Sequence, residues 1–185
     1  MALLTACQHE LNTDTAYRID RVVVEPVPHS YGPIIKARLK SRFQAVADDI
    51  NRQIPATAES RDLIVRVESV DYVPPTGPLL LGKGELEGQI VVQSSHASQT
   101  LEFGARNRRQ SGLGDYLNLS GYYRAGASFD RLATELAYKF SRRYAAEHGT
   151  TPIRRDDLAH SPRPATAPSI ASEVPPPPLV VLGGV

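Results

Sequence analysis

The chain has 185 residues, of which 41% are hydrophobic and 22% are charged, as in an ordinary single globular domain. Its 21 Lys and Arg residues nearly balance its 20 Asp and Glu residues, which argues against a nucleic-acid binder because such proteins usually carry a basic excess. No apolar run reaches the ~18–20 residues that a membrane-spanning helix needs. The single cysteine excludes an internal disulfide and a cysteine-rich metal site.

Prolines divide the chain into an ordered and a disordered part. Eight of the 15 prolines lie at or after Pro152, and four of them are consecutive. The segment from residue 150 onward has no helical or alternating apolar period, so it cannot bury enough apolar surface to offset the entropy lost on ordering. We therefore expect a linker over residues 1–14, a folded domain over residues 15–149 and a disordered, proline-rich tail over residues 150–185.

The first half of the domain predicts a strand, a long helix and a second strand. Tyr17–Val24 is rich in β-branched residues and is followed by Pro26, which indicates a strand. Apolar residues then recur at intervals of three or four, which predicts a helix with one buried stripe. The stripe consists of Ile35, Leu39, Phe43, Val46, Ile50 and Ile54. Alternation from Leu63 indicates the next strand, and a change of phase at Val70 predicts a β-bulge near Ser69.

The second half predicts a hairpin and a second helix. Leu86–Val92 is the third expected strand, and a polar turn separates it from a fourth. The inward-facing residues of that fourth strand are expected to be Leu101, Phe103 and Ala105. Residues 106–127 are rich in Gly and Arg, which favours a long loop. A helix is then expected from about Phe129, with Ser128 as its N-cap.

The expected order β-α-β-β-β-α indicates an α+β fold. A strand, a crossover helix and a three-stranded meander form one small mixed sheet. Both helices then cover the same face of that sheet, because each has one apolar stripe to bury, and the result is a two-layer sandwich. No internal repeat is visible.

The sequence Leu4-Thr5-Ala6-Cys7 resembles the lipobox of bacterial lipoproteins. In that family the cysteine thiol is diacylated, the preceding peptide is removed and the new amino terminus is acylated. The resemblance implies that Cys7 is the lipidated residue. Only six residues precede Cys7, whereas a signal peptide needs an apolar core of about 7–15 residues. Residues 1–4 look like the end of such a core, so we expect that the start codon is misassigned or that the chain is trimmed.

The resemblance also implies a location. In lipoproteins of Gram-negative bacteria an Asp after the cysteine usually retains the protein in the inner membrane, and here Gln8 takes that position. The implied destination is the outer membrane, on its periplasmic face. The membrane would be the first partner of the chain, through the acyl groups on Cys7. Each buried methylene contributes about 0.8 kcal/mol, so several acyl chains make a stable anchor.

Two sets of residues are candidates for binding a protein partner. The first consists of consecutive leucines at an expected hairpin tip: Leu79, Leu80 and Leu81. They would form an exposed apolar finger that contacts a partner or lipid, although folding back onto the core is equally consistent with the sequence. The second set combines Arg and Tyr, two residue types that are enriched at the hot spots of protein interfaces. It consists of Arg106, Arg108, Arg109, Tyr122 and Tyr123 in the expected loop. The alternative is that these side chains are simply exposed to solvent and bind no partner.

No set of residues for catalysis stands out. Residues 77–84 approach a P-loop, but Gly84 follows Lys83 where that motif needs a Ser or Thr to hold magnesium. The next residues also indicate a strand, whereas phosphate binding needs a helix amino terminus. The five histidines are scattered without the spacing of a zinc site. We therefore expect no enzymatic activity, no metal and no cofactor.

The lipobox, the β-α-β-β-β-α domain and the proline-rich tail together are similar to small proteobacterial lipoproteins of unknown function. The element order alone also resembles auxiliary lipoproteins of envelope transport, including those of lipopolysaccharide assembly and ABC transport. The leading hypothesis is a non-enzymatic outer-membrane lipoprotein that acts as a subunit or accessory of an envelope protein assembly. The alternative is a lipid- or small-ligand-binding module of a transport system that uses the groove between sheet and helices.

Overall fold

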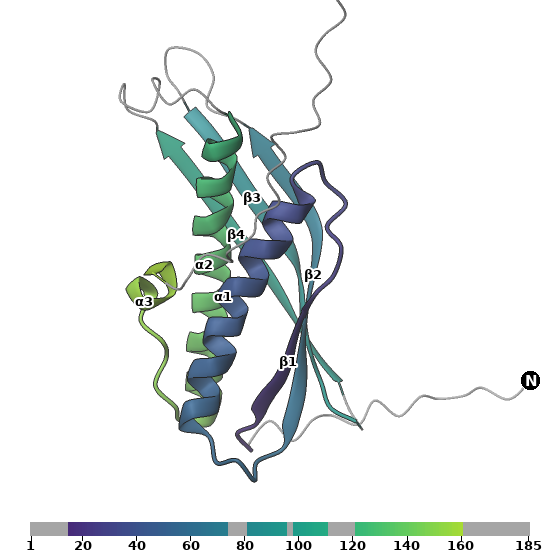
Figure 1. The fold of residues 1–185 in the computed structure, drawn as a ribbon, viewed down its shortest axis with the longest axis vertical. Helices are drawn as coiled ribbons and strands as arrows, with labels where there is room; N and C mark the ends of the chain where they lie inside the picture. Colours follow the sequence, from purple (N-terminus) through teal and green to yellow (C-terminus); the bar gives the residue numbers. More distant parts are fainter. Residues whose placement is uncertain (1–14, 74–80, 96–97, 111–120, 161–185) are drawn as a thin grey trace, which may run out of the picture.

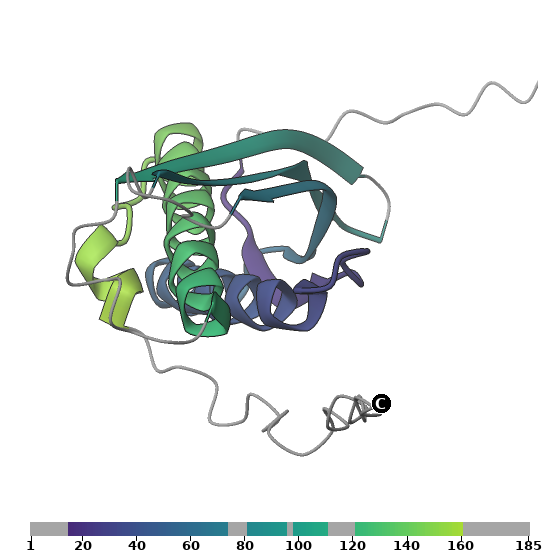
Figure 2. The ribbon, with the colours of Figure 1, turned by 90° about the horizontal axis from the view of Figure 1, so that it is seen from above.

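A computed structural model of the protein describes residues 15–73, 81–95, 98–110 and 121–160 (Figure 1). Within these ranges the elements are β1 (Arg18–Val24), α1 (Gly32–Gln53), β2 (Ser60–Val73), β3 (Leu81–Gln93), β4 (Ser98–Gln110), α2 (Gly121–His148) and α3 (Arg155–His160). The strands form one sheet in the order β1-β2-β3-β4, and α1 and α2 cover one face of it (Figures 1 and 2). The predicted α+β sandwich is confirmed, and α3 is an additional helix.

The sheet is mixed because α1 connects two parallel strands. β1 pairs with β2 in parallel, whereas β2, β3 and β4 form an antiparallel meander. The register between β2 and β3 shifts between Val67 and Ser69, which confirms the predicted bulge and keeps the later apolar residues of β2 on the core face. A Cβ added to Gly88, on β3 beside the bulge, would overlap the carbonyl oxygen of Arg66. The bulge therefore requires a glycine at this position.

The core lies between the sheet and the two long helices. All six residues of the predicted stripe of α1 are buried, with Ile54 just beyond the end of the helix. α2 contributes a matching buried stripe of Phe129, Leu132, Leu136, Phe140 and Tyr144. The rings of Phe43 and Phe140 join the helices, with their centroids 5.9 Å apart. Apolar burial of this kind is the main source of stability, at about 1.5–3 kcal/mol for each large side chain.

Several element boundaries differ from the expectation. The prediction of a loop over residues 106–127 is wrong at both ends, because β4 continues to Gln110 and α2 begins at Gly121. Ser128, the expected N-cap, is a buried residue inside α2. β3 likewise begins early, at Leu81, and its register with β4 is unbroken over the whole length of both strands. The backbone pairing thus extends beyond the residues whose side chains form the core.

The prediction of disorder from residue 150 is wrong for residues 150–160. This segment ends in α3, which packs against α2 and α1 (Figure 2). Leu158 is completely buried, and Ile153 packs against the core. The backbone N–H of Ile153 also donates to the hydroxyl of Ser141 at 3.0 Å. The folded part includes this segment, and the remaining residues of the predicted tail lie outside the described ones.

Candidate functional site

One end of the sheet carries the end of β2, the start of β3 and the end of β4. We call it the upper end because it is uppermost in Figure 1. Leu81 begins β3 here, and Arg108 and Arg109 lie among the last residues of β4. α2 also begins at this end, so Tyr122 and Tyr123 lie in its first turn. Leu81 and the described residues of the Arg/Tyr set, which are separate in the sequence, therefore share one end of the domain.

The other predicted site residues lie outside the residues that the structure describes. Cys7, Leu79 and Leu80 do not belong to the described residues, and neither does the tip of the expected hairpin. Their proposed roles stay predictions from the sequence.

Arg106 lies on the edge strand β4 and not on a loop. Its Nε and Nη2 donate to the carboxylate of Glu85, directly opposite on β3, at 2.8 and 2.5 Å. Lys83 binds the same carboxylate at 2.9 Å and bonds Asp71 on β2 at 2.5 Å. The hydrogen bond from Arg106 is the main cause of the lowered pKa of Glu85, and the bond to Asp71 is the main cause of the raised pKa of Lys83. Exposed pairs of this kind contribute little to stability, so Arg106 can exchange its partner.

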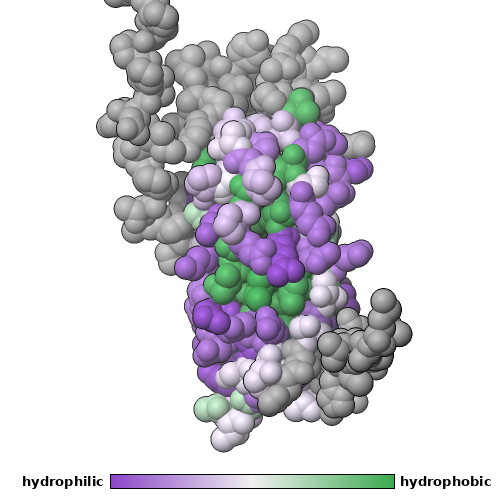
Figure 3. Space-filling model, turned by 90° about the vertical axis from the view of Figure 1, so that its right-hand side faces the viewer, coloured by the Kyte–Doolittle hydropathy of each residue, from purple (hydrophilic) through white to green (hydrophobic). Residues whose placement is uncertain are grey.

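The face of the sheet away from the helices, the outer face, carries an apolar row between charged pairs. Val23, Ile64 and Val91 lie side by side on β1, β2 and β3. Figure 3 shows apolar surface on this side of the molecule, bordered by hydrophilic side chains. Ion pairs between neighbouring strands flank the row, namely Arg21–Asp62 at 2.5 Å and Arg66–Glu25 at 2.8 Å.

A hollow of about 360 Å³ opens on the outer face beside this row. Val23 and Ile64 supply its apolar lining. The rest is polar and consists of Asp20, Arg21, Ser60, Asp62, Gln93, Ser94 and Ser95. Its volume is within the range of small-molecule sites, and its polar lining suits a polar ligand better than an acyl chain. The groove expected for the alternative function lies elsewhere, between sheet and helices, where the described core residues pack against one another.

The lower end of the domain, where β1 begins, is held by a group of buried aromatic and charged side chains that the sequence does not indicate. The backbone N–H of Tyr17 donates to the Tyr144 hydroxyl at 3.1 Å, and that hydroxyl donates to the Tyr17 carbonyl at 2.5 Å. The guanidinium of Arg61 stacks on the Tyr17 ring, 4.3 Å from its centroid, and pairs with Glu59 at 2.8 Å. Burial raises the pKa of both Tyr17 and Tyr144.

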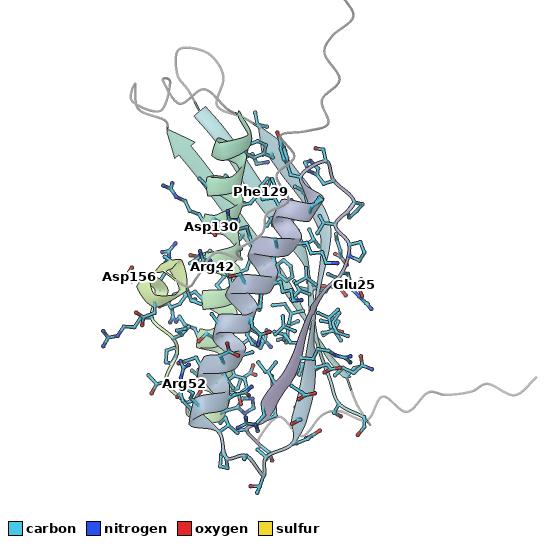
Figure 4. The ribbon with its side chains drawn as sticks, viewed as in Figure 1. Glu25, Arg42, Arg52, Phe129, Asp130 and Asp156 are labelled. Atoms are coloured by element: carbon cyan, nitrogen blue, oxygen red, sulfur yellow. The ribbon has the colours of Figure 1, made fainter. Side chains whose placement is uncertain are left out.

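A second residue that sequence patterns miss is Arg42, whose side chain is only 2% exposed. It points from α1 toward α2 and α3 (Figure 4). Its Nη2 donates to both carboxylate oxygens of Asp130, at 2.9 and 3.1 Å. The same guanidinium donates to the backbone carbonyls of Leu158 and Ala159. Arg42 therefore fastens α3 to the helical layer, and its role is structural.

Within the described parts of the chain, no helix is both long and apolar enough to cross a membrane. Among the same residues, no group of three or more His, Cys, Asp or Glu side chains is placed to hold a metal ion.

No protein-family model matches the chain, and no curated protein matches it. Among solved structures, the chain is similar to a crystal structure of a minor lipoprotein from Acinetobacter baumannii, with a TM-score of 0.45 and 11% sequence identity. The matched region covers 71% of this chain and 92% of that one. A likeness at this level assigns neither a family nor a function.

Proposed function

We propose that the protein is a non-enzymatic, lipid-anchored accessory subunit of a protein assembly in the bacterial envelope. The observation that carries this proposal is the lipobox-like sequence Leu4-Thr5-Ala6-Cys7. It stands ahead of a domain whose first strand begins at Arg18. Acylation of Cys7 attaches the chain to a membrane. Gln8 in the following position selects the outer membrane, with the domain on the periplasmic side.

The layout of the domain supports a tethered subunit. The chain enters at the lower end, whereas Leu81, Arg108 and Tyr122 lie at the upper end. β3 has 13 residues, so at about 3.3 Å per residue the two ends are roughly 40 Å apart. The described chain therefore begins at the end of the domain opposite to the described residues predicted to bind a partner.

The anchor is tested by expressing the gene from an upstream start codon and labelling cells with a palmitate analogue. The wild-type protein is expected to take up label and to fractionate with the outer membrane. Cys7→Ala is expected to abolish both, because the acyl acceptor is gone. Gln8→Asp keeps the thiol and is the matched control, since it is expected to retain the label while moving the protein to the inner membrane. Equal labelling of wild type and Cys7→Ala would refute the anchor.

The partner is tested by affinity purification from detergent-solubilised membranes. Replacing Arg106, Arg108 and Arg109 together by Ser is expected to release the partner with little change in melting temperature, because exposed charges stabilise weakly. The matched control changes the same number of exposed arginines on α2, namely Arg131, Arg142 and Arg143, and is expected to keep the partner. If the first variant retains every partner of the wild type, these arginines are only a solvated surface.

The second candidate function is binding of a small polar ligand in the hollow on the outer face. The volume of about 360 Å³ and the carboxylates of Asp20 and Asp62 favour a ligand with hydroxyl or amino groups. A thermal-shift screen of such compounds should find one that stabilises the wild type. Asp20→Asn should remove that stabilisation, whereas Arg131→Ser on the distant α2 should not. A hit that stabilises both variants equally would place its binding site elsewhere.

A further inference from the structure

β4 is the last strand of the sheet, and no other described strand pairs with its outer edge (Figure 2). It is 13 residues long and pairs with β3 along its whole length. The edge of a strand presents N–H and C=O groups in a row, and such a row is a template for a further strand.

Lys139 identifies the peptide groups of β4 that face this edge. Its Nζ donates to the carbonyl oxygen of Gly104 at 3.0 Å, so that carbonyl points away from β3. Backbone groups of alternate residues in a strand point to the same side. The even-numbered residues from Ser98 to Gln110 therefore direct their N–H and C=O groups outward, whereas the odd-numbered residues bond to β3.

At the opposite edge of the sheet, side chains bond to the backbone at the start of β1. The Asn51 side chain accepts a hydrogen bond from the N–H of Ile19 at 2.9 Å and donates to its carbonyl at 2.7 Å, as a neighbouring strand would. Tyr144 holds the backbone of Tyr17 in the same way. On β4 the described hydrogen bonds include one such contact, from Lys139. Side chains thus occupy backbone groups at the start of β1, whereas over the described residues of β4 such a contact is made by Lys139 to Gly104.

The sequence of β4 suits antiparallel pairing with itself. Gly104 is the central residue of Ser98–Gln110. In an antiparallel pair of two copies about Gly104, each outward-facing residue of one copy meets an outward-facing residue of the other, so both hydrogen bonds of every pair can form. In this register Glu102 lies opposite Arg106 of the second copy, and two-fold symmetry repeats the pair. Opposite charges at directly opposed positions stabilise a strand pair.

Gly104 itself has no evident role inside the domain. A Cβ added there would meet no heavy atom within 4 Å, and its φ is not in the left-handed region. A glycine in the interior of a strand weakens it and often marks the close approach of another backbone. At the symmetry axis of the pair, the other backbone is that of Gly104 in the second copy.

We propose that β4 pairs antiparallel with β4 of a second copy of this chain, centred on Gly104, to form a two-fold symmetric dimer. The two four-stranded sheets then join into one sheet of eight strands. Arg106 turns from Glu85 to Glu102 of the second copy. The Gly104 carbonyl has two lone pairs, so it binds Lys139 and the opposing N–H together. A closed two-fold interface requires one surface that is complementary to itself, and the outer edge of β4 meets this requirement.

The first test measures the mass of the full chain by sedimentation over a range of concentrations, and a concentration-dependent dimer is expected. Glu102→Arg and Arg106→Glu each place like charges opposite one another, so each should weaken the dimer by roughly tenfold or more. The double variant Glu102→Arg/Arg106→Glu restores opposite charges and should restore the dimer. Glu68→Arg, on β2 two strands away from this edge, is the control that should not change it. Melting temperatures identify any variant that fails to fold.

The second test fixes the register by oxidative cross-linking in a Cys7→Ala background. Residues in a hydrogen-bonded antiparallel pair have Cα atoms about 5.5 Å apart, which is within reach of a disulfide. Gly104→Cys should therefore form a covalent dimer with itself. Ser98→Cys should not, but it should do so when mixed with Gln110→Cys. A monomeric chain at every concentration, or a dimer in which Gly104→Cys does not cross-link, overturns the proposal. Neither test depends on lipidation of Cys7, so the dimer and the proposed anchor can fail separately.

Discussion

Leu158 tests whether the segment after α2 stabilises the domain. Its side chain is 0% exposed, and its backbone carbonyl accepts a hydrogen bond from Arg42. Leu158→Ala removes three carbon atoms from the core, and at about 0.8 kcal/mol for each buried methylene this amounts to roughly 2.4 kcal/mol. α3 has only six residues and can shift to fill part of the space, so the upper range for core leucines, ~5 kcal/mol, is not expected. Leu158→Ala is therefore expected to lower the free energy of unfolding by about 2–3 kcal/mol.

The assay is urea unfolding followed by circular dichroism, with thermal melting as a second measurement. The unfolding midpoint should fall at an unchanged slope, and the melting temperature should fall by roughly 5–10 °C. Ala159→Ser is the matched control, because the neighbouring residue is exposed, and its effect should stay within about 0.5 kcal/mol. A chain that ends after Gly149 should also be less stable than one that ends after His160.

The reasoning is refuted if Leu158→Ala changes the free energy of unfolding no more than Ala159→Ser does. Equal stability of the two shortened chains would lead to the same conclusion. In either case α3 would not be docked in solution, and residues 15–149 would be the complete folded unit.

Two further predictions concern the β-bulge and the buried tyrosines. Gly88→Ala presses a Cβ against the carbonyl of Arg66, so urea unfolding should show a loss of more than about 1 kcal/mol, whereas Gly126→Ala, in open space on α2, should be stabilising. Burial raises the pKa of Tyr17 and Tyr144 above the ordinary value of about 10, so their contribution to stability is complete below pH 10 and is lost as the pH rises toward the raised values. Ultraviolet titration should therefore show tyrosines that ionise only as the protein unfolds, and normal titration of all eight would contradict this.

The parts of the fold that the sequence predicts correctly depend on local periodicity. The stripe through Leu39 and Phe43 specifies α1, because residues three and four apart share one helical face. The phase change at Val70 reveals the bulge, because alternation of period two breaks only where an extra residue enters the strand. Both signals lie within a short stretch of sequence, so no knowledge of distant contacts is needed.

The errors arise where the structure depends on distant partners. The end of β4 beyond Arg106 carries polar residues and looks like a loop, but its backbone pairs with β3, which supplies the hydrogen bonds whatever the side chains are. The first turns of α2 contain Gly121 and Gly126, poor helix formers. α3 has one fully buried apolar residue, Leu158, and the hydrogen bond to its carbonyl comes from Arg42, 116 positions away. No periodic pattern could have shown that contact.

The side-chain hydrogen bonds at the start of β1 make the resistance of the domain to a pulling force depend on where the force is applied. A pull on the chain ahead of Thr15 acts along β1, and because β1 runs parallel to β2, it loads their hydrogen bonds together in shear instead of opening them one by one. The Tyr144 hydroxyl and the Asn51 amide add attachments to both long helices at the same place. At the other end of the described chain, a pull acts on α3, which is held by buried Leu158, by the hydrogen bonds from Arg42 and by the ion pair Arg155–Glu135. Among the described elements, the start of β1 is thus built to bear load, and the six-residue helix α3 is expected to yield first.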